Sequence, residues 1–436
     1  MYTREVLSAL KKKGIEIGDT VSIRVGEKEY SGILLENASK NTDVLELKLN
    51  NGYNIGIKYN DGIRLVGKKE GKIPYENEEA TKIKGNLSVL MFGGTISSKV
   101  EYKTGAVFPA MTAKEFEESF PEARKFCTPM FRNVMSILSE DINTHHWEVM
   151  CKEIYNELKE EIPVVATHGT DTMGFSAAAA SFAIRNPVKP VVFTGAQRSS
   201  DRGSSDNKEN FLNSAYYASR GKPGVFVCMH ATMNDTTAHV HLGTRVRKMH
   251  TSRRDAFKSI NSRPFAEVDY SKGMIKYLIE NETSKNDMAL VNTFNDNVAL
   301  IYTYPGIKPS FISRLSDYDG VVIAGTGLGH VPSNPFGDLI ATPIIKEVRE
   351  LVNSGVFVVI APQTIYGRIN LEVYTAGRML KDAGVIGHLH DWLPETAYVK
   401  LCWVLGQTKK KDDVERMMYT NYANEISNRS LIENFY

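Results

Sequence analysis

Cysteine and tryptophan are scarce in this chain, which has 4 cysteines and 3 tryptophans in 436 residues. The cysteines lie far apart and form no C-x-x-C pair, so neither a disulfide framework nor a structural zinc site is expected. Cys151 would share a helical face with Trp147 and Ile154, which favours a small buried side chain over a reactive thiol. This cysteine usage is typical of a protein of the reducing cytoplasm.

Long apolar runs and a large excess of one charge are also lacking. Stretches such as VFVVIA are far shorter than the ~20 residues that span a bilayer, and the N-terminal MYTREVLSALKKKG lacks the pattern of a secretory signal. The 53 basic and 51 acidic residues leave a net charge of +2, so the basic clusters at 11–13, 253–254 and 409–411 are expected to be solvated faces. We therefore expect a cytoplasmic chain of two or three domains with no membrane contact.

Residue patterning divides the chain into five parts. Residues 1–67 contain alternating strand-like segments separated by GD, NNG and NDG turns, which predicts a small all-β barrel. Residues 68–85 mix Lys and Glu with Gly and Pro and predict a linker. Apolar runs alternate with helical patterns over 86–275 and again over 290–405, which predicts two α/β domains with parallel sheets. Residues 406–436 predict a polar, partly helical tail.

Two glycine-rich turns follow predicted core strands. LSVLMF is followed by GGTISS, which places Thr95 at the strand end, and IPVVAT is followed by HGTDT, which places Thr170 and Asp171 there. Ligands of open α/β sheets bind at the carboxyl ends of strands, although such residues alone more often cap the next helix. A threonine nucleophile needs a neighbouring base, and Lys248 in RVRKMH is a candidate that Asp171 would hold in place. A lysine acts as a base only in its neutral form, which burial favours.

Four motifs together resemble the bacterial-type L-asparaginases. FGGTISS is similar to the first threonine loop of that family, HGTDTM to the second, TGAQR at 194–198 to the next strand end, and GTRVRKMHTSRRDAF to the segment with the catalytic lysine. The motifs occur in the family's order across roughly residues 86–405. The resemblance implies an asparaginase-like two-domain fold and hydrolysis of an amide through an acyl-enzyme, without a metal or organic cofactor in this chain. It implies Thr95 as the primary nucleophile, and Thr170, Asp171 and Lys248 as the triad of the second threonine.

The resemblance also implies three residues that contact the substrate. Tyr102, which has a Tyr-x-x-Gly spacing to Gly105, would be a partner of Thr95. Ser139 and Glu140 in SILSEDI would hold the α-carboxylate and α-amino ends of the substrate. At the second of these positions the family commonly has glutamine, so Glu140 is a departure from its pattern.

The additional segments at both ends suggest a complex, because a hydrolase of a free amino acid has no evident need for them. The chain resembles the D subunit family of the archaeal Glu-tRNA(Gln) amidotransferases in its arrangement. A barrel precedes an asparaginase-like body, which ends in the segment LPETAYVKLCWVLGQT. The resemblance implies that L-glutamine or L-asparagine supplies ammonia, which the E subunit of the amidotransferase uses with ATP and Mg²⁺ to convert Glu-tRNA(Gln) to Gln-tRNA(Gln). It also implies a homodimer core. Glu-tRNA(Gln) is then expected to bind mainly through the E subunit.

Other functions remain open from the residues alone. A free-standing L-asparaginase or glutaminase would use the same catalytic residues, and a ligand-binding module without catalysis could share the fold. VVIAGTGLGH suggests a dinucleotide-binding oxidoreductase, but His330 stands where the fingerprint requires Gly or Ala. A metal-dependent hydrolase is suggested by His239-x-His241 with Asp235 and by HLHD at 388–391, although neither set has a firm third ligand.

Overall fold

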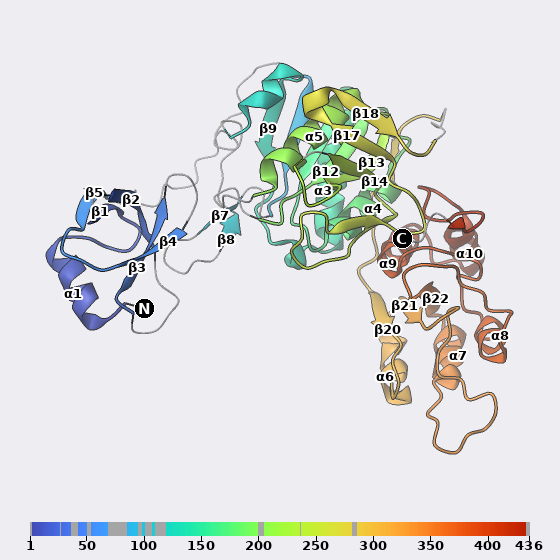
Figure 1. The fold of residues 1–436 in the computed structure, drawn as a ribbon. Coiled ribbons are helices and arrows are strands. Elements are labelled where there is room, and N and C mark those ends of the chain that lie inside the picture. Colours follow the sequence, from blue (N-terminus) through green and yellow to red (C-terminus); the bar gives the residue numbers. More distant parts are fainter. Residues whose placement is uncertain are drawn as a thin grey trace.

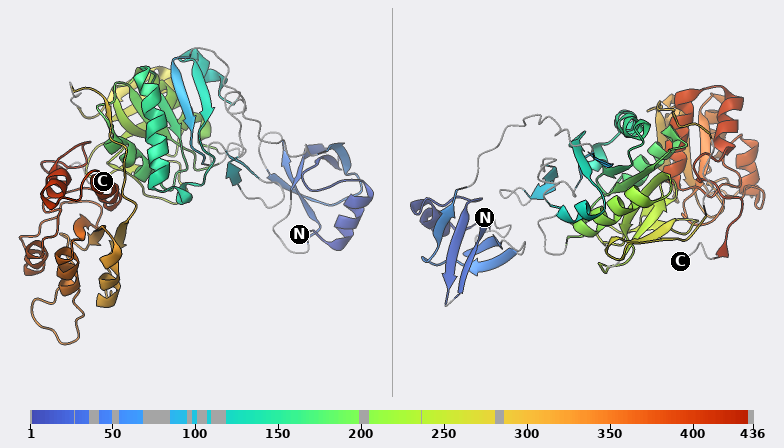
Figure 2. Two further views of the ribbon diagram at one scale, coloured as in Figure 1. Left: turned by 180° about the vertical axis from the view of Figure 1, so that it is seen from behind. Right: turned by 90° about the horizontal axis from the view of Figure 1, so that it is seen from above.

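The computed structural model places more than half of the described residues in helices and strands (Figures 1 and 2). It describes residues 2–26, 28–35, 42–49, 54–68, 85–94, 98–100, 107–109, 119–198, 205–235, 237–280 and 286–432. Thr95, Tyr102 and nearly all of the predicted linker lie outside these residues. In the part that the structure describes, no helix is long and apolar enough to cross a membrane.

The N-terminal region is a five-stranded antiparallel sheet with the order β4-β3-β2-β1-β5. Among the described residues, pairing ends at β4 on one side and at β5 on the other. Alternate residues such as Val21, Ile23, Leu45 and Leu47 are fully buried, as the period of two in the sequence predicts. The strands are β1 (Thr20–Val25), β2 (Lys28–Leu35), β3 (Val44–Leu49), β4 (Asn54–Lys58) and β5 (Arg64–Gly67).

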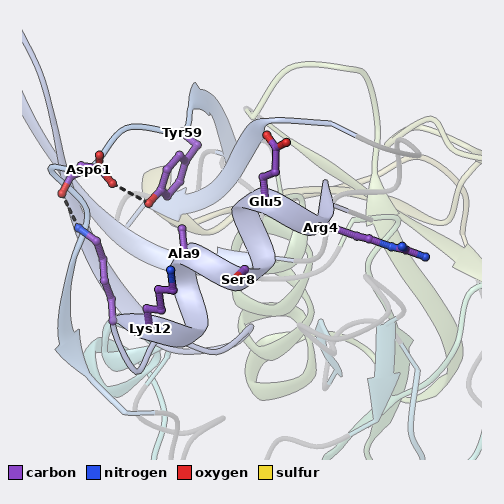
Figure 3. Close-up of a pocket in the computed structure, with 8 residues that line it drawn as sticks. Arg4, Glu5, Ser8, Ala9, Lys12, Tyr59 and Asp61 are labelled. Carbon is purple, nitrogen blue, oxygen red and sulfur yellow. Dashed lines mark hydrogen bonds between the residues drawn. The ribbon is translucent and has the colours of Figure 1, made fainter.

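A helix that the sequence pattern did not indicate, α1 (Arg4–Lys12), precedes this sheet. Thr3 caps its first turn by accepting a hydrogen bond from the backbone of Val6, and Val6 and Leu10 are buried one turn apart. A shallow depression lies beside it (Figure 3), lined by Arg4, Glu5, Ser8, Ala9, Lys12, Lys13, Tyr59 and Asp61. Both acidic and basic side chains line this depression, so its electrostatic field does not favour the binding of an anion.

The main body is built on an eight-stranded sheet with the order β18-β17-β14-β13-β12-β10-β6-β9. Its strands are β6 (Leu87–Met91), β9 (Pro129–Asn133), β10 (Val164–Thr167), β12 (Pro190–Thr194), β13 (Gly224–His230), β14 (Ala238–Leu242), β17 (Ala266–Asp269) and β18 (Met274–Tyr277). The half from β9 to β13 is parallel, as predicted, whereas β14, β17 and β18 add antiparallel pairs. The connection from β13 to β14 is too short for the crossover that a parallel pair requires.

Helices cover both faces of this sheet. α3 (Thr144–Lys159) and α4 (Met173–Ala183) pack on one face, and α5 (Asn207–Arg220) packs on the other. Within β10, Val164 and Ala166 join the core of the first face and Val165 that of the second, so the whole strand is buried. The smaller elements of the body are β7 (Ser98–Val100), β8 (Val107–Pro109), η2 (Pro121–Lys125), η3 (Ser139–Asp141), β11 (Ile184–Arg185), β15 (Val246–Lys248), β16 (Phe257–Ser259), η4 (Tyr270–Lys272) and β19 (Ala289–Leu290).

The C-terminal region has a three-stranded parallel sheet with the order β20-β21-β22. The predicted strand segments VVIAG and VFVVIA are β21 and β22. Val322 and Val359 of this sheet share one core with α3, α4 and α9, so that core continues from the main body. The elements are β20 (Val298–Tyr302), α6 (Pro309–Ser313), η5 (Arg314–Asp317), β21 (Gly320–Gly325), α7 (Ile345–Asn353), β22 (Phe357–Pro362), α8 (Thr375–Asp382), α9 (Pro394–Gln407) and α10 (Lys411–Tyr419).

The segment predicted to be a polar tail packs onto the body as far as residue 427. α10 buries Val414 and Met418. Beyond α10, the carboxylate of Glu425 is buried and accepts a 2.7 Å hydrogen bond from Nζ of Lys400 in α9. This segment is therefore an integral part of the C-terminal core, to which it contributes the buried carboxylate of Glu425 as well as apolar side chains.

Candidate active site

The three glycine-containing turns of the predicted motifs leave the main sheet at one edge. Met91, Thr167 and Thr194 are paired in register at the carboxyl ends of β6, β10 and β12. The ladder continues one residue further, because the backbone N–H of Phe92 bonds to Thr167 and that of His168 bonds to Thr194, both at 2.9 Å. The three turns therefore begin side by side.

Glycines allow these turns to touch. A Cβ on Gly94, whose φ is +87°, would lie 2.3 Å from the backbone nitrogen of Gly169. A Cβ on Gly169 would lie 2.6 Å from Cβ of Ser139, and one on Gly195 would lie 3.0 Å from Cγ2 of Thr170. No side chain fits at such distances, so glycine at these positions brings the residue before Thr95 against the residue before Thr170.

Thr170, Asp171 and Lys248 meet at this edge. Nζ of Lys248 donates hydrogen bonds to Oγ1 of Thr170 at 2.9 Å and to Oδ1 of Asp171 at 2.7 Å. Thr170 is buried and the Lys248 side chain is 13% exposed, whereas the Asp171 side chain is 66% exposed. The lysine comes from β15, some 77 residues after the aspartate. A hydroxyl, an amine and a carboxylate in this order are the groups that activate a threonine.

Ser139 and Glu140 lie in η3, beside the second threonine turn. Ser139 is buried against Gly169, and its carbonyl accepts a 2.6 Å hydrogen bond from Oγ1 of Thr172. Its own hydroxyl is 3.5 Å from a carboxylate oxygen of Glu140, which is exposed. The structure thus places Ser139 next to the triad. Thr95 and Tyr102 lie outside the described residues.

Two supporting groups, one of them inside the HGTDT motif, were given no role by the sequence analysis. The imidazole of His168 is buried behind the second turn, and its Nδ1 donates to the carbonyl of Gly169 at 2.7 Å. Burial lowers the pKa of His168 to about 4, so the ring is neutral. The buried carboxylate of Asp206 accepts hydrogen bonds from the backbone N–H groups of Gln197 and Arg198, each at 3.0 Å. His168 stands directly after a predicted strand, whereas nothing local in the sequence marks Asp206.

The dinucleotide and metal hypotheses have little structural support. Over residues 326–344, all of them described, no helix follows β21, whereas a dinucleotide fingerprint opens a helix directly. Thr326 and His330 instead close a turn by paired backbone hydrogen bonds. Asp235, a proposed metal ligand, bonds to His230 at 3.1 Å and to Arg254. Within the described ranges, no three His, Cys, Asp or Glu side chains are grouped so as to hold a metal ion.

Family models match three consecutive parts of the chain. The asparaginase N-terminal model matches residues 86–282, the glutaminase/asparaginase C-terminal domain model matches 297–418, and the GatD N-terminal domain model matches 15–66. The glutamyl-tRNA(Gln) amidotransferase D subunit of Pyrococcus furiosus is 43% identical over 433 residues, covering 96% of each chain. That of Methanothermobacter thermautotrophicus is 43% identical over 445 residues, covering 100% of this chain and 99% of the relative. This chain belongs to the glutamyl-tRNA(Gln) amidotransferase D subunit family.

The solved structures bear out the fold. The thermostable L-asparaginase from Thermococcus kodakarensis superposes with a TM-score of 0.70 at 28% identity, covering 79% of this chain and 99% of that protein. The predicted resemblances to the asparaginases and to the D subunit family are therefore both confirmed. In this D subunit family member, the asparaginase-like body carries the threonine turns, and the N-terminal antiparallel sheet is the part that the GatD model recognises.

Proposed function

We propose that this D subunit family member generates ammonia from the side-chain amide of L-glutamine or L-asparagine for a tRNA-dependent amidotransferase. The observation that carries the proposal is the contact of Lys248 with both Thr170 and Asp171 at the edge where the glycine turns meet. Relatives that match end to end are amidotransferase subunits, which supports this role over a free-standing hydrolase.

In the proposed reaction the hydroxyl of Thr95 attacks the amide carbon, and its proton passes through the Thr170, Lys248 and Asp171 group to the leaving nitrogen. Ammonia departs and an acyl-threonine remains, which water hydrolyses to the free acid. Backbone N–H groups of the glycine turns would hold the oxyanion. Tyr102 would partner Thr95, while Ser139 and Glu140 would hold the two ends of the substrate. No metal or organic cofactor takes part in this chain's chemistry.

The second half of the reaction belongs, in this proposal, to a partner. The E subunit of the amidotransferase would take up the ammonia, bind Glu-tRNA(Gln) and use ATP and Mg²⁺ to form Gln-tRNA(Gln). The near-neutral charge of this chain supports a minor role for it in tRNA affinity. In this proposal the chain also forms the homodimer core of the complex, and the complex is located in the cytoplasm.

The direct test measures ammonia release from L-glutamine and L-asparagine by the purified chain, first alone and then with the E subunit and Glu-tRNA(Gln). We expect slow release by the chain alone and faster release in the complex. Thr95→Ala and Lys248→Ala should each lower the rate, the latter by about 10²- to 10⁴-fold as for loss of a general base. Robust release that neither substitution changes would refute the assignment of the site.

The same assay separates the alternative functions. Fast release by the chain alone, unaffected by the partner and abolished in both variants, would indicate a free-standing asparaginase or glutaminase. No ammonia release with or without the partner, together with binding of either amino acid in a separate binding measurement, would indicate a binding module.

A further inference from the structure

The strand that carries Lys248 does not belong to the main sheet. Among the described strands, β15 pairs with β16 alone in a two-stranded sheet, whereas Thr170 and Asp171 follow β10 of the eight-stranded sheet. The main-sheet ladder therefore fixes the threonine and the aspartate but not the lysine. Other contacts must set the 2.9 Å distance between Nζ of Lys248 and Oγ1 of Thr170.

Alternate side chains of β15 face opposite ways, as in any strand. Val246 is buried in the core that α4 shares with α9. Arg245 and Arg247 contact the C-terminal region instead. Nε of Arg247 lies 2.8 Å from a carboxylate oxygen of Glu395, in the first turn of α9. Arg247 within β15 and Arg245 just before it thus tie this strand to the C-terminal region.

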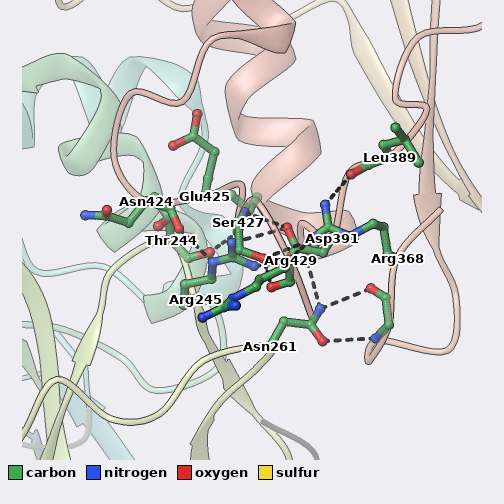
Figure 4. A network of polar contacts seen from close by, with 12 residues as sticks. Thr244, Arg245, Asn261, Arg368, Leu389, Asp391, Asn424, Glu425, Ser427 and Arg429 are labelled. Carbon is green, nitrogen blue, oxygen red and sulfur yellow. Dashed lines mark hydrogen bonds and ion pairs between the residues drawn. The ribbon is translucent and has the colours of Figure 1, made fainter. Parts of the chain in front are cut away.

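Arg245 is the more buried anchor. Its guanidinium donates through Nε to the carbonyl of Asn424 at 2.7 Å and through Nη1 and Nη2 to the carbonyl and Oδ1 of Asp391 at 3.1 and 3.2 Å (Figure 4). Its side chain is 3% exposed and that of Asp391 is 1% exposed. Next to it, the hydroxyl of Thr244 donates to the carbonyl of Ala423 at 2.7 Å.

The segment that receives these bonds, residues 420–427, is called the C-terminal strap here. The strap is fixed at both ends. Nζ of Lys400 donates to the carbonyl of Thr420 at 2.6 Å and to the buried carboxylate of Glu425 at 2.7 Å. The backbone N–H of Ser427 donates to Oδ1 of Asp391 at 2.9 Å, which ties the strap to the carboxylate that holds Arg245.

We propose that Arg245 and Arg247 are positioning residues, through which the C-terminal strap, Asp391 and Glu395 hold Lys248 against Thr170. The proposal rests on the proposed function, since it concerns the same amide hydrolysis. It means that the nucleophile side of the site is built by the main sheet, whereas the lysine is placed by the C-terminal region. Any shift of the strap or of the start of α9 then moves the amine relative to the hydroxyl.

The test uses the full-length chain under whichever condition of the ammonia assay gives turnover. Arg247→Gln and Glu395→Gln each remove the ion pair at the 2.8 Å contact in a partly exposed setting, where the protein should still fold. We expect kcat to fall about tenfold in each, because misplacement of a catalytic group by about 1 Å can cost up to about 10²-fold. KM should change by no more than about twofold, because the substrate contacts are untouched.

Further variants make the result specific. The double variant Arg247→Gln/Glu395→Gln should be no slower than either single one, since the two side chains act through one contact. Arg247→Lys, which keeps the charge, should recover part of kcat. Lys409→Gln breaks a 2.9 Å pair with Asp319 elsewhere in the C-terminal region and should leave kcat unchanged. Arg245→Lys, which cannot reproduce the three hydrogen bonds of the guanidinium, should lower kcat at an unchanged KM.

The outcomes separate the two proposals. Absence of hydrolysis by the unsubstituted protein, even with its partner, contradicts the proposed function. Hydrolysis that keeps its kcat in Arg247→Gln, Glu395→Gln and Arg245→Lys overturns the positioning role alone. Losses that add in the double variant, or that Lys409→Gln matches, would also overturn it, since they would indicate general destabilisation.

Discussion

At the scale of single residues, the geometry of the site depends on glycines. A Cβ on Gly94 would drive its turn away from Gly169, whereas one on Gly169 would meet Ser139 and one on Gly195 would crowd Thr170. The hydroxyl and amine that meet there do so because the backbone around them can approach closely. Catalysis is therefore expected to be sensitive to the replacement of these glycines by alanine, although this adds no charge and removes no functional group.

Gly94→Ala tests this dependence against a matched control. Gly94 and Gly306 have φ values of +87° and +85°, but a Cβ on Gly306 would meet no described atom within 4 Å. Both substitutions incur the left-handed backbone cost of about 1–2 kcal/mol. Gly94→Ala should lower the free energy of unfolding by a further 1–3 kcal/mol or so, the range of overpacking, and should also reduce ammonia release.

Urea denaturation followed by circular dichroism measures the free energy of unfolding of both glycine variants, and the ammonia assay measures their activity. Equal stability and equal activity of Gly94→Ala and Gly306→Ala would contradict the close approach of the two turns.

The sequence predicted the site residues that lie in short motifs. Thr170, Asp171 and Lys248 were recognisable because each follows a strand or stands in a distinctive local pattern, and the structure brings them together. Arg245 and Arg247 lie in the same motif as Lys248, but their partners lie up to 179 residues away. Nothing local in the sequence indicates such contacts, because they are set by how the C-terminal region packs.

At the scale of elements, regular hydrophobic runs were predictable and their pairing was not. β6, β10, β12, β21 and β22 each coincide with an apolar run that predicts a strand. The antiparallel half of the main sheet was missed because a strand's direction depends on the length of the connection before it. α1 was missed because its apolar face consists of little more than Val6 and Leu10, within a segment rich in charge.

The ion pair between α9 and the strap gives a prediction at this scale. Lys400 and Glu425 are both fully buried. Lys400→Met leaves the carboxylate without its cation, which should lower the free energy of unfolding by about 3–5 kcal/mol. Adding Glu425→Gln removes the charge and should recover part of that loss. Equilibrium urea unfolding of the two variants provides the comparison.

Lys409→Gln is the control for an exposed ion pair, because the pair of Lys409 with Asp319 is open to solvent. This substitution should lower the free energy of unfolding by less than about 1 kcal/mol. A Lys400→Met variant no less stable than Lys409→Gln would show that the strap is not held by this pair.

At the scale of the whole molecule, buried neutral histidines link stability to pH. Burial lowers the pKa of His168 and of His390 to about 4 each, from an ordinary value of 6.5. Below pH 6.5 the unfolded chain binds protons that the folded protein does not, so stability falls as the pH drops from 6.5 towards 4. Each such histidine should contribute a slope of up to about 1.4 kcal/mol per pH unit in that window.

His168→Asn isolates one contribution, because an amide N–H can replace the Nδ1 donor to Gly169 without titrating in this range. The free energy of unfolding of this variant should fall less steeply than that of the unsubstituted protein between pH 6.5 and pH 4. Between pH 7 and pH 8 the two should run parallel. Identical slopes throughout would mean that His168 accepts a proton in the folded state.

The central claim is that the amide is cleaved at the site of Lys248 and that the ammonia is passed to a partner. Glutamine labelled with ¹⁵N in its side-chain amide tests it directly in the complex of this chain with the E subunit, Glu-tRNA(Gln), ATP and Mg²⁺. We predict ¹⁵N in the glutamine of Gln-tRNA(Gln) with the unsubstituted chain and none with Lys248→Ala, which free ammonium should rescue. Transfer from glutamine that persists in Lys248→Ala would contradict the account.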